Sequence, residues 1–420
     1  MTLRKSLSIY TFASLINASI PFLLLPILTA YLTPEEYGLL SIIQIFIVLT
    51  VPFISINIGN TLQLNYHHLE QKEFSVLVSS ILVIPMVTIF IVLLFFLISE
   101  SVINSFLDIS LVWLLTIPLI AFMQVLPQTV LSIYQISERP INYGKYQILL
   151  ALANLILTIG FVVMLKFSWE GRVLAILISY TIFTAIGIYL LIKMDLIVFK
   201  IERKYIKEAL KLGLPLIIHV VSGALFMMSD RLFISYYLGN SEVGIYAVGA
   251  QISMIALIIQ QSFNQAWVPY LFKNLKTNLY ENDVKIVKIS YMAFAFFLVL
   301  PFIVYLLSFP IFDFFINERF AESIHYIFWI ALGFSLLGMY KVVTNYIFYE
   351  KKTGILAILA FSSLVLNFIL NYTFIQQFGT IGVAYATAIT IGVFFIIVFI
   401  MANKIHRMPW LYFLSRRKID

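Results

Sequence analysis

Long runs of apolar residues are the feature that most limits what this chain can fold into. The run from Ile81 to Ile98 contains one proline, one threonine and no charged residue. A helix needs about 20 mainly apolar residues to cross the hydrocarbon core of a bilayer, and many runs here reach that length. Membrane β-barrels instead show alternating segments of roughly 10 residues. The chain is therefore predicted to be an all-α integral membrane protein.

Composition supports the same prediction and narrows the chemistry. The chain is 62% hydrophobic and 11% charged, whereas ordinary globular domains carry about 25% charged residues. It has no cysteine, which excludes thiol chemistry and cysteine-rich metal sites. It has no Walker A or HExxH sequence, and His67-His68 has no convincing partner ligands. We therefore expect no enzyme activity, no cofactor and no metal site.

Twelve transmembrane helices are predicted, with connections too short to hold a sizeable extramembrane domain. The first apolar block is too long for a signal peptide and is interpreted as a membrane helix. The predicted organisation is an N-terminal six-helix bundle (1–193), an amphipathic cytoplasmic linker (194–212), a C-terminal six-helix bundle (213–403) and a basic cytoplasmic tail (404–420). The predicted spans are 7–32, 37–60, 76–98, 110–133, 144–165, 173–192, 213–238, 244–268, 286–308, 323–347, 355–376 and 380–402.

The 27 Lys and Arg residues predict the orientation. Cytoplasmic loops of membrane proteins carry an excess of positive charge. With the N-terminus placed inside, nearly all basic loop residues fall on the inner side, and only Lys166, Arg172 and Arg319 fall outside. Both termini are thus predicted to be cytoplasmic. The net charge of +7 then reflects topology, and no nucleic-acid partner is expected.

The segment from Ile201 to Gly213 has the pattern of an amphipathic helix. Ile201, Tyr205 and Ala209 fall on one helical face, and most of the basic residues of the segment lie elsewhere. Such a helix can lie on an anionic leaflet, so membrane lipids are expected partners.

An internal repeat relates the two halves of the chain. Residues 31–38 (YLTPEEYG) match residues 237–244 (YLGNSEVG) at four positions, and each copy is predicted to be a tight outer turn between a first and a second helix. A looser match relates 154–157 (NLIL) to 367–370 (NFIL). Six spans per half give both halves the same orientation. Parallel repeats of this kind are a transporter architecture.

These segments resemble a known family. Residues 230–234 (DRLFI), 242–246 (EVGIY) and 32–39 (LTPEEYGL) look like signatures of bacterial polysaccharide flippases of the O-antigen and capsule type. That family belongs to the MATE-like MOP exporter superfamily. The resemblance implies translocation of undecaprenyl-diphosphate-linked oligosaccharides to the outer leaflet of the bacterial inner membrane. It also implies contact with the polysaccharide polymerase and chain-length machinery.

Charges inside the predicted spans are the candidate transport residues, because a charge at a helix centre costs roughly 2.5–3.5 kcal/mol on insertion scales. The residues concerned are Asp230, Arg231 and Lys341. His219 shares a stripe of the seventh span with Asp230. In the functional interpretation, Asp230 and His219 couple transport to H⁺ or Na⁺, and Arg231 or Lys341 meets the diphosphate. In the structural interpretation, these residues are satisfied by neighbours or snorkel to the interface.

Uncharged amides also recur at helical spacing. Either a wet, sugar-compatible lumen or interhelical hydrogen bonding explains this pattern. Gln261, Gln265 and Asn345 are the candidate glycan-binding residues. The i,i+4 pairs are Gln124/Gln128, Gln260/Asn264, Gln261/Gln265 and Lys341/Asn345.

Two other functions stay open at this point. A multidrug or cation antiporter of the same fold would favour several buried carboxylates, and the spans offer one. A membrane-embedded polysaccharide polymerase usually shows a large outer loop with arginines. The longest predicted outer loop here, about 309–322, contains a single arginine.

Overall fold

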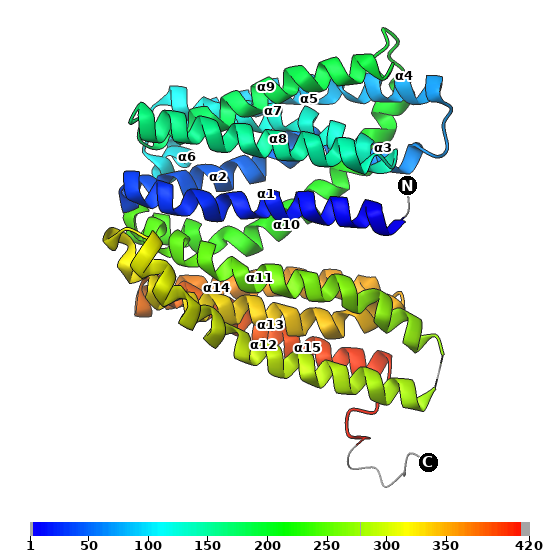
Figure 1. The fold of residues 1–420 in the computed structure, drawn as a ribbon, viewed down its shortest axis with the longest axis vertical. Helices are drawn as coiled ribbons and strands as arrows, with labels where there is room; N and C mark the ends of the chain where they lie inside the picture. The colour runs from blue at the N-terminus through cyan, green and yellow to red at the C-terminus, as the bar shows by residue number, and fades with distance from the viewer. Residues whose placement is uncertain (1–2, 278, 413–420) are drawn as a thin grey trace. The chain divides into compact units, whose positions relative to one another are not determined.

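A computed structural model describes residues 3–277 and 279–412 of this protein, and the described residues form helices and connections without a strand (Figure 1). Twelve of the helical segments are long and apolar enough to cross a membrane. The predictions of an all-α membrane fold and of twelve spans are therefore confirmed. Arg416, Arg417 and Lys418 of the predicted basic tail lie outside the described residues.

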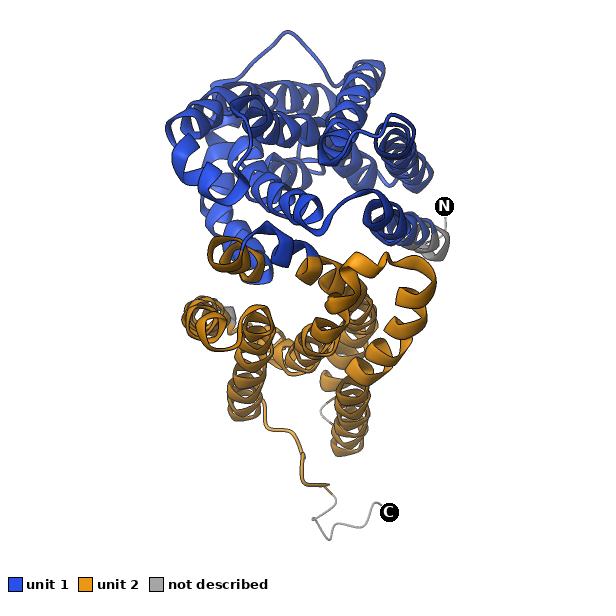
Figure 2. Cartoon of the chain, turned by 90° about the vertical axis from the view of Figure 1, so that its left-hand side faces the viewer, with its two compact units in different colours: residues 1–228, 239–244 blue, residues 229–238, 245–420 orange. Residues whose placement is uncertain are grey.

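The chain divides into two compact units (Figure 2). Unit 1 comprises residues 1–228 and 239–244, and unit 2 comprises residues 229–238 and 245–420. Helices α10 (Arg203–Leu238) and α11 (Asn240–Leu275) therefore contribute to both units. The remaining elements of unit 1 are α1 (Leu3–Tyr31), α2 (Pro34–Ser55), α3 (Ile58–Asn65), α4 (Gln71–Ile81), α5 (Val83–Ile98), α6 (Glu100–Leu107), α7 (Leu111–Ile136), α8 (Pro140–Thr158), the π-helix η1 (Ile159–Met164) and α9 (Trp169–Lys193).

Unit 2 is built from fewer and longer helices. The segment after its last helix contacts the helix that contains Tyr291, whose hydroxyl donates to the Trp410 carbonyl (2.6 Å). His406 Nδ1 also lies 2.7 Å from Glu350 Oε1. The elements of unit 2, besides its parts of α10 and α11, are α12 (Tyr280–Phe315), the 3-10 helix η2 (Glu318–Ser323), α13 (Ile324–Tyr349), α14 (Thr353–Phe378) and α15 (Thr380–Ile405).

The two units repeat one packing scheme. In unit 1, α9 packs against both α7 and α8, and α7 packs against α5. In unit 2, α15 packs against both α13 and α14, and α13 packs against α12. These are the third to sixth spans of each half, taken in the same order. The internal repeat seen in the sequence is thus matched by the internal packing of each unit.

The repeated turn motif lies at the starts of α2 and α11, and both starts belong to unit 1. Thr33 caps α2 in a capping box: Glu36 N–H donates to Thr33 Oγ1 (3.3 Å), and Thr33 N–H donates to Glu36 Oε2 (2.8 Å). The start of α11 packs against this turn. A Cβ on Gly38 would lie 1.8 Å from the Asn240 carbonyl oxygen, and a Cβ on Gly244 would lie 1.8 Å from the Pro34 carbonyl oxygen. The two repeat glycines therefore allow the backbones to touch.

The predicted second span, 37–60, is broken by two consecutive left-handed residues. Ile56 has φ 46° and Asn57 has φ 51°, so α2 ends at Ser55 and α3 starts at Ile58. Left-handed backbone is unfavourable for a β-branched residue such as isoleucine, and costs of order 1–3 kcal/mol. The strained segment is held by α10, because the Ile56 carbonyl oxygen occupies the space where a Cβ of Gly213 would stand.

The predicted interfacial helix is instead the first turns of α10. Tyr205 and Ala209 of the predicted apolar face are buried in the protein. Just before it, Lys200 Nζ (2.8 Å) and Lys204 Nζ (2.9 Å) bind Glu202. Hydrogen bonds from Lys200 and then Lys204 lower the pKa of Glu202. The predicted apolar face is thus covered by protein at Tyr205 and Ala209 and exposed at Ile201.

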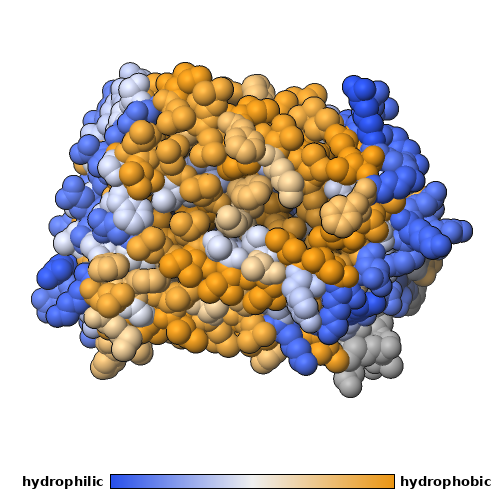
Figure 3. Space-filling view, turned by 90° about the horizontal axis from the view of Figure 1, so that it is seen from above, coloured by the Kyte–Doolittle hydropathy of each residue, from blue (hydrophilic) through white to orange (hydrophobic). Residues whose placement is uncertain are grey.

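The outer surface fits a bilayer. The face shown in Figure 3 is hydrophobic across its centre, and hydrophilic residues gather at its left and right ends. Large apolar side chains of α5, including Phe90, Ile91 and Ile98, are more than 60% exposed. Exposed apolar area on this scale would be an aggregation hazard in water. It is expected for a multi-pass membrane protein.

We predict that Gly213→Ala destabilises the protein, because its methyl group would lie 1.8 Å from the Ile56 carbonyl oxygen. Overpacking of this kind typically costs about 1–3 kcal/mol. Gly223→Ala on the same helix is the matched control, since a Cβ there meets nothing within 4 Å. Thermal unfolding in detergent should show a lower Tm for Gly213→Ala alone. Equal Tm values would contradict the close approach.

Candidate functional site

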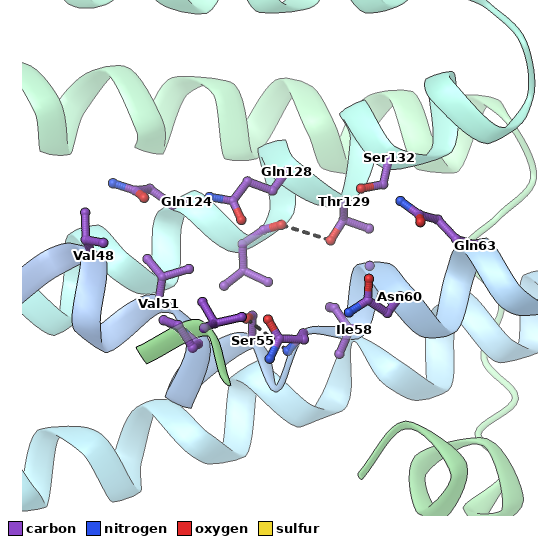
Figure 4. Close-up of a pocket in the computed structure, with 15 residues that line it drawn as sticks. Val48, Val51, Ser55, Ile58, Asn60, Gln63, Gln124, Gln128, Thr129 and Ser132 are labelled. Atoms are coloured by element: carbon purple, nitrogen blue, oxygen red, sulfur yellow. Dashed lines mark hydrogen bonds between the residues drawn. The ribbon is translucent and has the colours of Figure 1, made fainter. Parts of the chain in front are cut away.

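A polar cavity lies within unit 1, where the break between α2 and α3 faces α7 (Figure 4). Its volume is about 360 Å³. Figure 4 shows Gln124 and Gln128 on the α7 side, with Asn60 and Gln63 on α3. Of its 15 lining residues, five are Asn or Gln, three are Ser or Thr, and none is charged. The complete lining is Val48, Val51, Pro52, Ser55, Asn57, Ile58, Gly59, Asn60, Gln63, Gln124, Val125, Gln128, Thr129, Ser132 and Val220.

The amides of this cavity are not used to hold helices together. Within the described part of the chain, the side chains of Gln124 and Gln128 make no hydrogen bond to protein, and the buried Nδ2 of Asn57 has no partner. The pair Asn264 and Asn345 behaves differently, because Asn345 Nδ2 donates to Asn264 Oδ1 (2.9 Å) between α13 and α11. The two explanations of the amide pattern therefore apply to different pairs. Gln124/Gln128 line a cavity, and Asn264/Asn345 join two helices.

Asp230 is buried in unit 2 and satisfied by hydrogen bonds. The Tyr246 hydroxyl donates to Asp230 Oδ2 (2.7 Å), and the Arg231 N–H donates to Oδ1 (2.8 Å). Tyr246 is 1% exposed and comes from α11. The neighbouring Arg231 is half-buried, and its Nε is buried without a hydrogen-bond partner. A carboxylate held by a buried tyrosine is well placed to exchange a proton or contact a cation, and equally to fix α10 against α11.

The other candidate residues have different surroundings. His219 is exposed on the part of α10 that belongs to unit 1. Gln261 and Gln265 are both exposed on α11, whereas Lys341 is half-buried on α13. Gln260, which the sequence paired with Asn264, is fully buried, and neither atom of its amide has a partner.

Arg172 is just outside the predicted span 173–192. It lies in the first turn of α9, where its Nη1 donates to Asn154 Oδ1 (2.6 Å) and to Thr158 Oγ1 (2.7 Å). Asn154 Nδ2 in turn donates to Ser179 Oγ (3.0 Å). Position near the end of an apolar run cannot separate a loop arginine from one that folds back onto its neighbour helix. The sequence feature that marks this contact is Asn154, which belongs to the looser internal repeat.

The matching asparagine of unit 2 centres a second polar cluster. Ser229 Oγ donates to Asn367 Oδ1 (3.0 Å), and Asn371 Nδ2 donates to the same oxygen (3.0 Å). Asn367 Nδ2 donates to Thr387 Oγ1 (3.3 Å). The looser of the two sequence repeats thus marks equivalent helix–helix contacts, α8 with α9 in unit 1 and α14 with α15 in unit 2.

Two family models match the sequence of this chain. A family model described as "Polysaccharide biosynthesis protein" matches residues 3–275, which is more than half of the chain. The chain belongs to the polysaccharide biosynthesis protein family. A second model, MatE, matches residues 215–373. The family resemblance inferred from the turn motifs is thereby confirmed.

Two proteins of Haemophilus influenzae are similar over most of this family member's length. An "Uncharacterized membrane protein" is 31% identical over 369 residues, covering 84% of this chain and 85% of that protein. "Lsg locus putative protein 1" is 25% identical over 407 residues, covering 91% and 95%. Neither name states a substrate, so these similarities support membership in a family of membrane proteins.

Solved structures show the fold. A multidrug resistance MATE family transporter superposes with a TM-score of 0.73 at 14% identity, covering 92% of this chain and 94% of that one. The lipid II flippase MurJ also gives 0.73 at 18% identity, covering 94% and 87%. At these identities the likeness establishes a MATE-like fold and no substrate.

We predict that Tyr246→Phe lowers thermal stability, because it removes the hydroxyl donor from a buried carboxylate. Leaving such a group unsatisfied costs about 1–3 kcal/mol. Tyr372→Phe is the control, since that ring is 50% exposed. The measurement is Tm in detergent for both purified variants. A Tyr246→Phe protein as stable as Tyr372→Phe would show that the hydrogen bond contributes nothing.

Proposed function

We propose that this protein is a flippase for undecaprenyl-diphosphate-linked oligosaccharides. It moves them from the cytoplasmic to the outer leaflet of the bacterial inner membrane by alternating access. The product serves surface polysaccharide biosynthesis of the O-antigen, lipopolysaccharide or capsule type. The observation that carries the proposal is the match of the polysaccharide biosynthesis model to residues 3–275. The amide-lined cavity of unit 1 supports it, because its groups suit hydroxyl-rich ligands.

The charged residues of unit 2 receive separate roles in this proposal. Arg231 and Lys341 bind the diphosphate, to which charge-assisted hydrogen bonds are suited. Asp230 couples transport to H⁺ or Na⁺, and His219, on the unit 1 part of α10, is a separate candidate for the same role. Gln261, Gln265 and Asn345 contact the glycan. Of these, Gln261 and Gln265 are exposed, whereas Asn345 is buried and donates to Asn264 Oδ1 (2.9 Å).

The proposed topology has both termini in the cytoplasm and follows from the excess of basic residues in the inner loops. Its consequence is that the start of α4 and the connection from α7 to α8 lie on the cytoplasmic side. Lys72 belongs to the first of these segments and Arg139 to the second.

A multidrug or cation antiporter is the second candidate function. It is favoured by the MatE match to residues 215–373 and by the MATE fold neighbours. Within the described residues, however, Asp230 is the only buried acidic side chain. An organic cation inside the membrane needs carboxylate partners, so this chain offers it little.

Gene deletion in the native host, with complementation, tests the function. We expect deletion to abolish surface polysaccharide and to trap the lipid-linked precursor in the inner leaflet. Wild type and Arg319→Ala should restore both, whereas Arg231→Ala at equal expression should not. Arg319 is a suitable control because it is an exposed arginine in η2. Normal surface polysaccharide combined with increased drug sensitivity would favour the antiporter instead.

Asp230→Asn tests ion coupling. If Asp230 carries the coupling ion, the variant should transport slowly and lose the dependence of transport on pH or Na⁺ that wild type shows. Asp313→Asn, an exposed aspartate near the end of α12, is the matched control. Transport of labelled precursor into everted vesicles over a range of pH and Na⁺ is the measurement. Wild-type behaviour of Asp230→Asn would exclude coupling through that residue.

A further inference from the structure

The cavity of unit 1 has a lining that selects a chemical class of ligand. Each carboxamide offers two N–H donors and one carbonyl acceptor, and each hydroxyl offers one donor and two acceptors. Five amides and the hydroxyls of Ser55 and Ser132 therefore present a dense, neutral mixture of donors and acceptors, while the Thr129 hydroxyl donates to the Val125 carbonyl (2.9 Å). A sugar ring presents the complementary mixture through its own hydroxyls. The aliphatic side chains of Val48, Val51 and Ile58 provide apolar surface for the C–H groups of such a ring.

Absence of charge in this lining argues against other ligands. A diphosphate is recognised by Arg, Lys or a metal through charge-assisted hydrogen bonds, and a cation by carboxylates. The lining residues include neither. An acidic sugar would also lose hydration without gaining an ionic partner. The cavity is therefore matched to an uncharged, hydroxyl-rich group.

The volume of the cavity indicates the size of its ligand, and the unpaired Nδ2 of Asn57 indicates one point of contact. About 360 Å³ is near the lower end of ligand pockets, which span roughly 300–1,000 Å³. Such a space suits a single sugar unit and not a whole oligosaccharide. The Nδ2 of Asn57 is a buried donor without a protein partner. A ligand oxygen at this point would remove the cost of leaving a buried donor unpaired.

We infer that the cavity of unit 1 binds one uncharged sugar unit of the lipid-linked oligosaccharide, through the free amides of α3 and α7. This inference rests on the proposed function and deepens it. The sugar and the diphosphate are then recognised by different residues, because the lining of this cavity has no charged side chain to bind a diphosphate. In the proposed topology, both the loop after α3 and the end of α7 lead to cytoplasmic segments. The cavity then receives the sugar on the side where the precursor is made.

The chain contains no cysteine, so single cysteines can report on the cavity in the full-length protein. Gln128→Cys places a thiol in the lining, and Gln135→Cys places one on the same helix at an exposed position outside it. Both are reacted with a membrane-impermeant maleimide in everted vesicles. The probes are the lipid-linked precursor extracted from the deletion strain, and undecaprenyl diphosphate without a sugar.

We expect the precursor to slow labelling of Gln128→Cys by about tenfold. This is the effect of about 90% occupancy, which leaves about a tenth of the cysteines free to react and corresponds to about 1.4 kcal/mol. Undecaprenyl diphosphate should not slow it, and neither probe should affect Gln135→Cys. Equal protection by both probes, or protection by neither, would overturn the inference. A deletion strain that accumulates no lipid-linked precursor would instead count against the proposed function itself.

A second variant keeps the test independent of cysteine chemistry. Gln124→Leu/Gln128→Leu removes two amides at nearly constant volume, and should lower the apparent affinity for the precursor about tenfold through two lost neutral hydrogen bonds. Gln135→Leu is the control, and Tm values confirm that each variant is folded. Wild-type transport by the double variant, in a system where wild type rescues the deletion, would overturn the sugar site while leaving the flippase intact.

Discussion

The cost of an unsatisfied polar group in hydrocarbon governs this structure. With no water to bond the backbone, a membrane-spanning segment must close its own hydrogen bonds, and the helix is how this chain does so. The same cost applies to side chains. Asp230 is bonded by Tyr246, Arg172 by Asn154 and Thr158, and Asn367 by Ser229 and Asn371. Polar groups left free, such as the amides of Gln124 and Gln128, therefore stand out as candidates for contact with water or a ligand.

Helix breaks determine where such free groups gather. In a regular helix Asn57, Asn60 and Gln63 would already share one broad face, because they are spaced three residues apart. Two left-handed residues, Ile56 and Asn57, change the direction of the chain between α2 and α3, and the three amides line the cavity together with α7. The redirected backbone is held by contact with Gly213, a residue far away in sequence. The left-handed residues, the distant glycine and the polar cavity thus meet at one place in unit 1.

The origin of each feature explains whether it could be predicted from the sequence. Apolar length alone gave the twelve spans, since hydrocarbon thickness sets one simple requirement. The YLTPEEYG and YLGNSEVG segments gave the turns, because capping and glycine requirements are local. The break at Ile56 could not be predicted, since isoleucine has no local preference for left-handed backbone. The burial of Tyr205 and Ala209 could not be predicted, because an amphipathic pattern does not say whether protein or lipid covers its apolar face.

The internal repeat explains how one scaffold can hold two kinds of site. Each unit keeps an asparagine on its fifth span that bonds to the sixth, Asn154 to Ser179 and Asn367 to Thr387. The partners added around them differ: unit 1 recruits Arg172, and unit 2 recruits Ser229 beside Asp230. A shared contact preserves the helix packing while the surrounding residues diverge. A neutral cavity in one unit and a buried carboxylate in the other are therefore compatible with one repeated packing scheme, because the residues of each site lie outside the shared asparagine contact.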